Sequence, residues 1–212
     1  MTRLVLIRHG ESVFNLERKY SGQLDIPLTE KGVTQAQKTA DYILENYKID
    51  VVYSSDLSRA INTAKPISEP LGLKINTDPR LREIYAGKWQ GLYFADVGVI
   101  YKEEYEAYKA DKENARTLGG EGMQDVMKRM LEAVWEIAEK NDGKTVLIST
   151  HNGPLMTLEV PLLNISLNEI YSLSNNSITE LEYSNGEFKL IKLGYDEHLG
   201  SLATKFTNKH SN

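Results

Sequence analysis

Short aliphatic segments alternate with longer amphipathic segments along the first 150 residues, and this alternation most constrains the fold. Runs rich in aliphatic residues predict strands near residues 3–8, 50–54, 73–77 and 144–150. The segments between several of them carry apolar residues at helical spacing. Strands that alternate with helices are typical of an α/β layer architecture with a largely parallel sheet. We therefore expect an α/β protein.

Three segments have the apolar periodicity of helices that pack on a sheet. Thr29 and Asp56 are predicted N-caps for the first two, because their side-chain oxygens can accept from free backbone N–H groups. Pro66 and Pro70 should kink or end the second helix, and residues 124–140 form the third. The predicted inward-facing residues are Val33, Ala36, Ala40, Ile43 and Leu44, then Leu57, Ala60, Ile61, Ala64 and Ile67, then Val126, Met127, Met130, Leu131, Val134, Ile137 and Ala138.

Two further regions depart from this alternation. Residues 178–193 predict a β-hairpin at the edge of the sheet, with Asn185 and Gly186 in a two-residue turn that requires positive φ. Residues 93–120 contain no strand-like run, and we expect a small helical cap insertion there. Its tyrosines at helical spacing favour packing on the core over covering a site; they are Tyr101, Tyr105 and Tyr108. The polar segment 205–212 should be frayed, with His210 solvated.

The composition excludes several classes of protein. The 212 residues are 41% hydrophobic and 26% charged, which is typical of a globular chain, and we expect one domain over residues 1–212. The absence of cysteine excludes a disulfide framework, a thiolate nucleophile and a Cys-based zinc site. A net charge of −5 argues against non-specific nucleic-acid binding. Because no apolar run resembles a signal peptide or a membrane span, we expect a cytoplasmic protein without a membrane partner.

Cationic side chains follow three of the predicted strands. Arg8 and His9 follow the first strand, Arg59 lies in the first turn of the helix after the second, and His151 follows the fourth. Ligands of open α/β sheets bind beyond the carboxyl ends of the strands, so these side chains should share one rim. Gly10 would let the backbone approach a ligand closely, and helix N-termini at the rim would attract an anion.

This set of side chains suits a phosphoryl group. Arginine pairs bidentately with phosphoryl oxygens and stays charged at any working pH. Arg8 and Arg59 should lower the pKa of His9 by repulsion between like charges, which keeps one ring nitrogen free to attack phosphorus. Glu83, just beyond the third strand, can protonate the departing alcohol and then act as a base. The residues therefore predict phosphoryl transfer through His9.

A metal site is the alternative use of His9 and His151. Catalytic zinc normally has three protein ligands, and the neighbouring arginines would repel a cation. We therefore expect no metal and no other cofactor.

Five ordered motifs resemble those of the histidine phosphatase superfamily, in its phosphoglycerate mutase-like branch: LIRHGES, DIPLTxxG, SSDLSRAxxTA, LREIYAGKWQG and STH. The resemblance covers most of the chain. It implies a three-layer α/β/α sandwich with helices on both faces of a mostly parallel sheet, and a covalent phosphohistidine on His9. Arg8, Arg59 and His151 would then clamp the phosphoryl group, with Glu83 as acid and base. The residues that match substrate-lining positions of the family are Asn15, Ser21 and Gly22.

The chain departs from the family's pattern at two positions. The family usually has glycine directly after the second histidine, where this chain has Asn152 followed by Gly153. How the backbone meets the phosphate at this point is therefore open, although Asn152 is still expected to contact the substrate. Where the family often reads GGES, Gly122 replaces the serine. Neither change removes a catalytic group.

The resemblance also bears on the choice between phosphatase and mutase. The mutase pattern places a tyrosine three residues and a lysine eleven residues after the catalytic glutamate, followed by an adjacent arginine pair. Here the two offsets fall on Ala86 and Phe94, and no two arginines are adjacent. We therefore expect a metal-independent phosphomonoesterase for a small phosphorylated substrate. A mutase is the first alternative, and a catalytically silent phospho-ligand binder the second. The substrate is open, as is the choice between monomer and homodimer.

Overall fold

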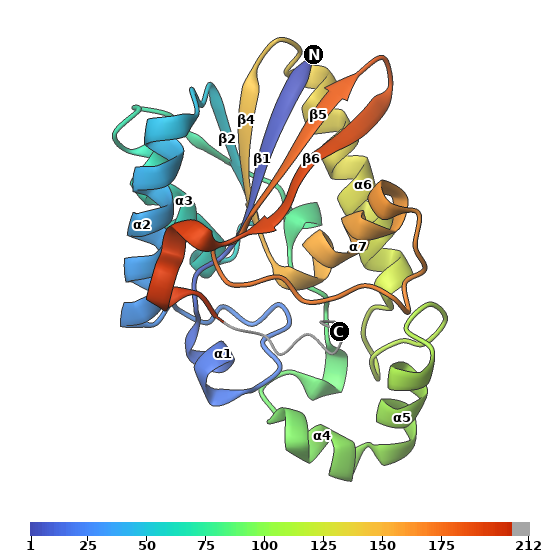
Figure 1. Cartoon of the computed structure of the whole chain (residues 1–212). Coiled ribbons are helices and arrows are strands. Elements are labelled where there is room, and N and C mark those ends of the chain that lie inside the picture. The colour runs from blue at the N-terminus through green and yellow to red at the C-terminus, as the bar shows by residue number, and fades with distance from the viewer. Residues whose placement is uncertain (205–212) are drawn as a thin grey trace.

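A single mixed β-sheet forms the centre of the part of the chain that the computed structural model describes, residues 1–204 (Figure 1). The expectations for residues 205–212, including His210, lie outside the described residues. The first four strands of the sheet pair in parallel, while β5 is antiparallel to both β1 and β6. In spatial order the six strands are β3 (Ile75–Thr77), β2 (Val51–Ser54), β4 (Thr145–Thr150), β1 (Thr2–Arg8), β5 (Ile178–Ser184) and β6 (Glu187–Tyr195).

Helices cover both faces of this sheet. α2 and α3 pack on one face and α6 and α7 on the other, while α4 and α5 lie beyond the carboxyl ends of the parallel strands (Figure 1). The predicted three-layer α/β/α sandwich is thus confirmed. The helix bounds are α1 (Val13–Glu17), α2 (Glu30–Asn46), α3 (Ser58–Ser68), α4 (Phe94–Ile100), α5 (Lys102–Ala110), α6 (Met123–Lys140) and α7 (Asn152–Leu163). Short 3-10 turns occur at Pro79–Leu81, Gly87–Trp89 and Glu197–Leu202.

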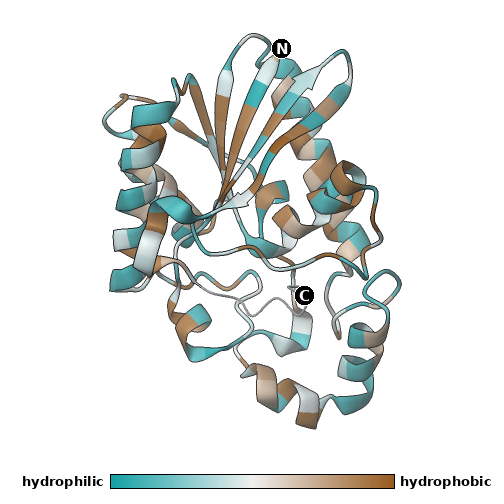
Figure 2. Ribbon diagram, in the orientation of Figure 1, coloured by the Kyte–Doolittle hydropathy of each residue, from teal (hydrophilic) through white to brown (hydrophobic). Residues whose placement is uncertain are grey.

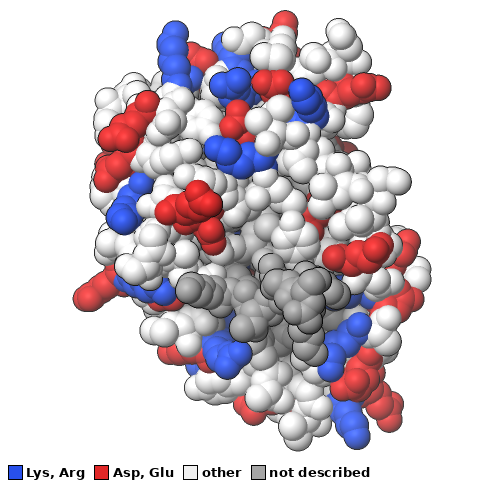
Figure 3. Space-filling model, viewed as in Figure 1, with Lys and Arg blue, Asp and Glu red and all other residues white. Residues whose placement is uncertain are grey.

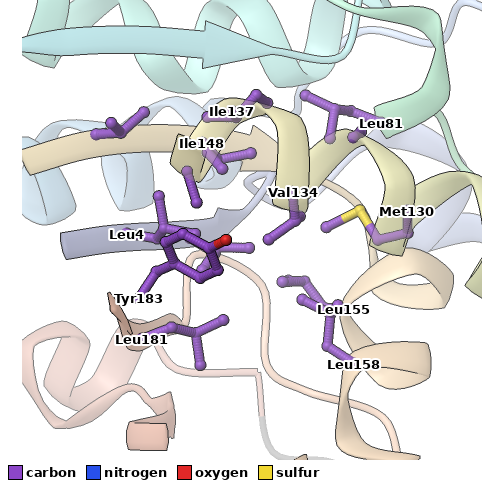
Figure 4. Close-up of a cluster of buried hydrophobic side chains, with 14 of the residues drawn as sticks. Leu4, Leu81, Met130, Val134, Ile137, Ile148, Leu155, Leu158, Leu181 and Tyr183 are labelled. Carbon is purple, nitrogen blue, oxygen red and sulfur yellow. The ribbon is translucent and has the colours of Figure 1, made fainter. Parts of the chain in front are cut away.

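Two hydrophobic clusters fill the spaces between the layers. Successive side chains of a strand point to opposite faces, so Leu4 and Leu6 pack toward α6 and α7, while Val5 and Ile7 pack toward α2 and α3. Figure 4 shows the first cluster, in which Leu4 and Met130 lie among other fully buried side chains. Because both faces are covered, the central strands are almost continuously hydrophobic (Figure 2).

The buried face of α2 differs from the predicted one at Val33. This side chain is 57% exposed, although Ala36, Ala40 and Ile43 are buried as predicted. Gln35 and Thr39 take the inward positions instead. Both make specific hydrogen bonds there: Gln35 Oε1 accepts from the Glu11 amide and Thr39 Oγ1 bonds to the His198 ring. Polar residues on the inner face shift the buried stripe away from Val33.

The start of α3 also differs from the prediction. Asp56 does not cap the helix, which begins after Leu57 without a side-chain cap. The Asp56 carboxylate instead accepts two hydrogen bonds from Arg82, at 2.6 and 2.5 Å. Pro66 lies inside the helix, which continues to Ser68.

The segment around α4 and α5 has a cluster of its own. Trp89 is fully buried, and its ring lies 5.9 Å from that of Tyr105 and 5.4 Å from that of Tyr108. The tyrosine stripe therefore packs as favoured, but on Trp89 rather than on the sheet.

The hairpin forms the predicted edge, with β6 outermost and φ of 53° at Asn185 and 83° at Gly186. On the face drawn in Figure 3, basic side chains lie among acidic ones. Across residues 1–204, no helix combines the length and apolar character needed to cross a membrane.

Candidate active site

The sheet brings the predicted cationic residues to one end of the molecule. Arg8 is the last residue of β1 and pairs in register with Thr150 of β4, so His9 and His151 leave adjacent strands side by side. Their ring centroids are 5.0 Å apart. A cavity of about 340 Å³ opens beside them. Eight predicted site residues line it: Arg8, His9, Asn15, Ser21, Gly22, Arg59, Glu83 and Asn152.

Two predicted site residues lie outside the lining of this cavity. His151 is fully buried beside His9. Gly10 packs against the start of α2, where a Cβ atom would lie 2.5 Å from the Gly32 carbonyl oxygen. Glycine at position 10 is therefore required by the approach of two backbone segments.

The ring of His9 is held in one tautomer. Its Nδ1 lies 2.7 Å from the carbonyl oxygen of Gly10. Because a carbonyl only accepts, Nδ1 carries the hydrogen of the neutral ring and Nε2 keeps a free lone pair. Burial, and then the charges of Arg59 and Arg8, lower the pKa of His9 well below its ordinary 6.5. At neutral pH His9 is thus a neutral imidazole with a nucleophilic Nε2.

Two buried guanidinium groups supply the positive charge of the site. Arg59 donates from Nη1 and Nη2 to the carbonyl oxygens of Leu24 and Gly22, both at 2.8 Å, so the loop before α2 orients it. Arg8 donates from Nη1 to the carbonyl of Leu173. Burial lowers the pKa of both, that of Arg8 to about 10, yet both stay charged at neutral pH. Such fixed cations favour a bound anion.

His151 is held by the loop that follows β2. Its Nε2 lies 2.8 Å from Ser55 Oγ, which also accepts from the Leu57 amide at 3.3 Å. Among the described residues Nδ1 of His151 has no hydrogen-bond partner, although it is buried. Burial, followed by the charge of Arg59, lowers the pKa of His151 well below 6.5. When Ser55 donates to Nε2, the neutral ring can donate from Nδ1 to an incoming anion.

Glu83 is fixed by the first turn of α7. Its Oε1 accepts from the amides of Ile84 at 2.9 Å and Gly153 at 3.0 Å. A Cβ on residue 153 would collide with this same oxygen, so glycine allows the close approach. Both bonds go to Oε1, which leaves Oε2 as the oxygen suited to carry a transferable proton.

Arg129 was not predicted from the sequence, but it supports the segment that carries Glu83. It donates to the backbone carbonyls of Arg80, Arg82 and Glu83 at 2.7, 2.5 and 3.0 Å. Its helical position on α6 gives no sequence signal for this role, because the contacts depend on tertiary packing.

Segment 172–177, which we name the support loop, is a second feature that sequence reasoning missed. Asn175 is 1% exposed, and its Nδ2 donates to the His9 carbonyl at 3.0 Å and to Asn15 Oδ1 at 3.2 Å. The Asn176 amide donates to the Arg8 carbonyl at 3.0 Å. The support loop therefore fixes the backbone of both residues of the Arg8–His9 pair. A polar loop before a hairpin carries no signal for contacts so distant in sequence.

Asn152, the departure from the family's pattern, is tied to the same loop. Its Oδ1 accepts from the Leu173 amide at 3.0 Å and its Nδ2 lies 3.2 Å from Ser172 Oγ. The backbone amide that meets the site here is that of Gly153, which bonds to Glu83. Gly122, the other departure, precedes α6 and donates to Asp125 Oδ2 at 2.8 Å.

The fold and the site define a class of phosphoryl-binding α/β/α proteins, with two histidines and two arginines buried at the strand ends. The model of the histidine phosphatase superfamily (branch 1) matches residues 4–196. The chain therefore belongs to this family, and it is an enzyme of the histidine phosphatase type. Residues 1–204 contain no group of three or more His, Asp or Glu side chains placed to hold a metal ion.

Individual relatives agree with this assignment. The chain is 32% identical over 209 residues to phosphoglycerate mutase-like protein 4 of Arabidopsis thaliana, covering 96% of this chain and 90% of that protein. It is 30% identical over 204 residues to phosphoserine phosphatase 1 of Hydrogenobacter thermophilus, covering 95% and 96%. The structure of Bacillus stearothermophilus YhfR matches with a TM-score of 0.89 and 32% identity, covering 94% of this chain and all of that one.

Proposed function

We propose that this protein is a metal-independent phosphomonoesterase that hydrolyses a small phosphorylated metabolite through a phosphohistidine on His9. The observation that carries the proposal is the bond between His9 Nδ1 and the Gly10 carbonyl, which directs the lone pair to Nε2. The lowered pKa of His9 keeps that lone pair free at neutral pH. Arg8 and Arg59 supply the charge that holds the phosphoryl oxygens.

The reaction proceeds in two half-reactions that return every group to its starting state. Nε2 of His9 attacks phosphorus, the bond from phosphorus to the ester oxygen breaks, and the carboxyl group of Glu83 gives its proton to the departing alcohol. Water then attacks the phosphohistidine while the Glu83 carboxylate takes a proton from it. The bond from phosphorus to nitrogen breaks, releasing inorganic phosphate and restoring neutral His9 and protonated Glu83.

Hydrolysis is favoured over transfer to a second hydroxyl group. The positions that the mutase pattern fills with tyrosine and lysine are Ala86 and Phe94, and both line the cavity. Neither side chain can bind a second phosphate, so water has access to the phosphohistidine. Among the relatives, the proteins named phosphoserine phosphatase 1 and glucosyl-3-phosphoglycerate phosphatase support the same choice. The substrate class is a small phosphomonoester.

Glu83→Gln tests the mechanism through two leaving groups. An alkyl phosphate needs a proton on its leaving oxygen, so its single-turnover cleavage should slow about a hundred-fold or more, because general acid catalysis contributes roughly 10² to 10⁴. The p-nitrophenolate ion leaves without a proton, so its release should slow far less. Rapid-mixing kinetics of p-nitrophenyl phosphate and a simple alkyl phosphate measure both rates. Equal losses on the two substrates would exclude Glu83 as the acid.

A further inference from the structure

Two polar side chains on one side of α7 hold the chain where the support loop begins. Asn152, in the first turn of the helix, accepts from the Leu173 amide at 3.0 Å. Glu159 lies about two turns further along on the same side, and its Oε2 accepts from the Tyr171 amide at 3.2 Å. Residues 171–173 are therefore bonded to α7 at both ends.

Residues 171–173 also reach the phosphoryl site. The Leu173 carbonyl accepts from Nη1 of Arg8, and Ser172 lines the cavity beside it. Asn152 Nδ2 donates to the Ser172 hydroxyl at 3.2 Å, which fixes the middle of the segment. A displacement of this segment would move the acceptor that orients the Arg8 guanidinium group. Small displacements of a binding group can cost large factors in rate.

Glu159 is an unusual residue for a purely structural contact. Its side chain is fully buried, and within residues 1–204 its Oε1 has no hydrogen-bond partner. Burying a carboxyl group with an unbonded oxygen costs stability, which an apolar side chain of similar size would avoid. The proposed mechanism of hydrolysis does not use this carboxyl group either. A role in holding the phosphoryl site explains the carboxyl group better than stability does.

The surroundings of Glu159 let its charge change near neutral pH. Burial raises the pKa of Glu159 to about 7, although the Tyr171 amide and the charge of Lys112 both favour the ionised form. Lys112 follows α5 and lines the cavity. The Tyr171 phenol is the other titratable group that interacts with Glu159. Burial, and then the charge of Glu159, raises the pKa of this phenol, so it stays protonated. The Tyr171 amide therefore gains a charged acceptor when Glu159 ionises.

We infer that Glu159 is a positioning residue for Arg8, because its carboxylate holds residues 171–173 and so fixes the acceptor of the guanidinium group. The inference rests on the proposed function and deepens it. A carboxylate accepts more strongly from an amide than a neutral carboxyl group does. Binding of a phosphomonoester should therefore tighten as Glu159 ionises. A direct effect of the new negative charge has the opposite sign, since it would weaken the binding of an anion.

Binding without turnover tests this sign. The probe is p-nitrophenyl phosphate, a dianion throughout the neutral range, and calorimetry with His9→Ala gives its Kd. Between about pH 6 and about pH 8, Kd should fall about five-fold more than it does when Glu159→Gln is added. Glutamine keeps an acceptor for the Tyr171 amide but does not titrate. Lys112→Met should move the midpoint of the change to higher pH, because the lysine no longer favours the ionised form.

Glu132→Gln is the matched control, because it removes one negative charge from the exposed side of α6. It should keep the full pH dependence of Kd.

Steady-state kinetics in the otherwise wild-type enzyme separate positioning from a structural role. Glu159→Leu removes the acceptor of the Tyr171 amide, so KM for p-nitrophenyl phosphate should rise about ten-fold, and Glu159→Gln should recover most of this loss. An equal rise in both variants, or a Kd that increases with pH in His9→Ala, would overturn the inference. Failure of the wild type to hydrolyse p-nitrophenyl phosphate would instead contradict the phosphatase mechanism, because the binding measurements do not depend on turnover.

Discussion

The proposed reactivity of His9 depends on the atoms that hold its ring. The Gly10 carbonyl fixes Nδ1–H, while burial, and then the charges of Arg59 and Arg8, keep the ring neutral. The backbone on which this ring is mounted is fixed in turn by the support loop. At this scale a catalytic side chain and the groups that orient it are inseparable, because small displacements of a reacting atom can cost large factors in rate.

Asn175→Ala tests the contribution of the support loop. The substitution removes the hydrogen bonds to the His9 carbonyl and to Asn15 Oδ1. We expect kcat for p-nitrophenyl phosphate to fall about ten- to a hundred-fold, because Nε2 loses its alignment with phosphorus. KM should change much less, since the arginine clamp remains. Steady-state kinetics measure this split between kcat and KM.

Asn62→Ala, on the exposed side of α3, is a control that should behave like the wild type. A loss of thermal stability in Asn175→Ala with unchanged kcat of the folded fraction would show that Asn175 only supports the fold. Partial recovery of kcat in Asn175→Gln would support positioning through the amide group.

Residues whose roles follow directly from chain position could be predicted from the sequence. Arg8 and His9 end a strand whose hydrophobic run is unmistakable, so their place at the rim followed from the sheet alone. Arg129 and Asn175 could not be predicted, because they bond to backbone atoms far away in the chain. Every residue type has a backbone carbonyl, so the sequence does not indicate which residue such a side chain contacts.

At the scale of elements, the aliphatic strands and helix periodicities predicted an α/β protein with a largely parallel sheet, and the family resemblance implied its three layers. Neither predicted every buried helix face. Val33 was expected inside because it is apolar, whereas Gln35 and Thr39 occupy the inner face through specific polar contacts. Asp56 has the chemistry of a cap but pairs with Arg82 instead. These contacts depend on tertiary partners that outweigh local preference. The spacing of hydrophobic residues therefore does not predict them.

The packing of residues 93–120 likewise depends on tertiary contacts that the sequence pattern does not predict. Its tyrosines pack on Trp89 and so stabilise a small cluster of their own. Tyr108 belongs to this cluster and also lines the cavity. The cap insertion expected at residues 93–120 stays a prediction.

For the whole molecule, buried titratable groups link stability to pH. Burial lowers the pKa of His9 and His151 well below 6.5, and lowers that of His198 to about 4. Between about pH 4.5 and 6.5 the unfolded chain therefore binds protons on these histidines that the folded chain does not. Glu159, with its pKa raised to about 7, has the opposite effect. In this pH range the unfolded chain therefore binds nearly two protons more than the folded chain.

The free energy of unfolding should accordingly be highest above about pH 6.5 and fall as the pH is lowered toward 5. Its slope against pH should correspond to the uptake of nearly two protons on unfolding. Urea unfolding at several pH values measures this slope. His198→Gln, which removes one of the three histidines, should reduce the slope by about one proton. A free energy of unfolding that is constant over this range, or that rises on acidification, would contradict the assignment of neutral buried histidines.

The most direct test of the central claim is the release of p-nitrophenol from p-nitrophenyl phosphate by the wild type and His9→Ala, in the presence of EDTA. The account predicts that the wild type keeps its activity under chelation and that its His9 peptide carries phosphate after rapid quenching, whereas His9→Ala loses both while remaining folded. Phosphate on His151, persistent activity in His9→Ala, or loss of wild-type activity with EDTA would contradict a metal-independent phosphohistidine mechanism on His9.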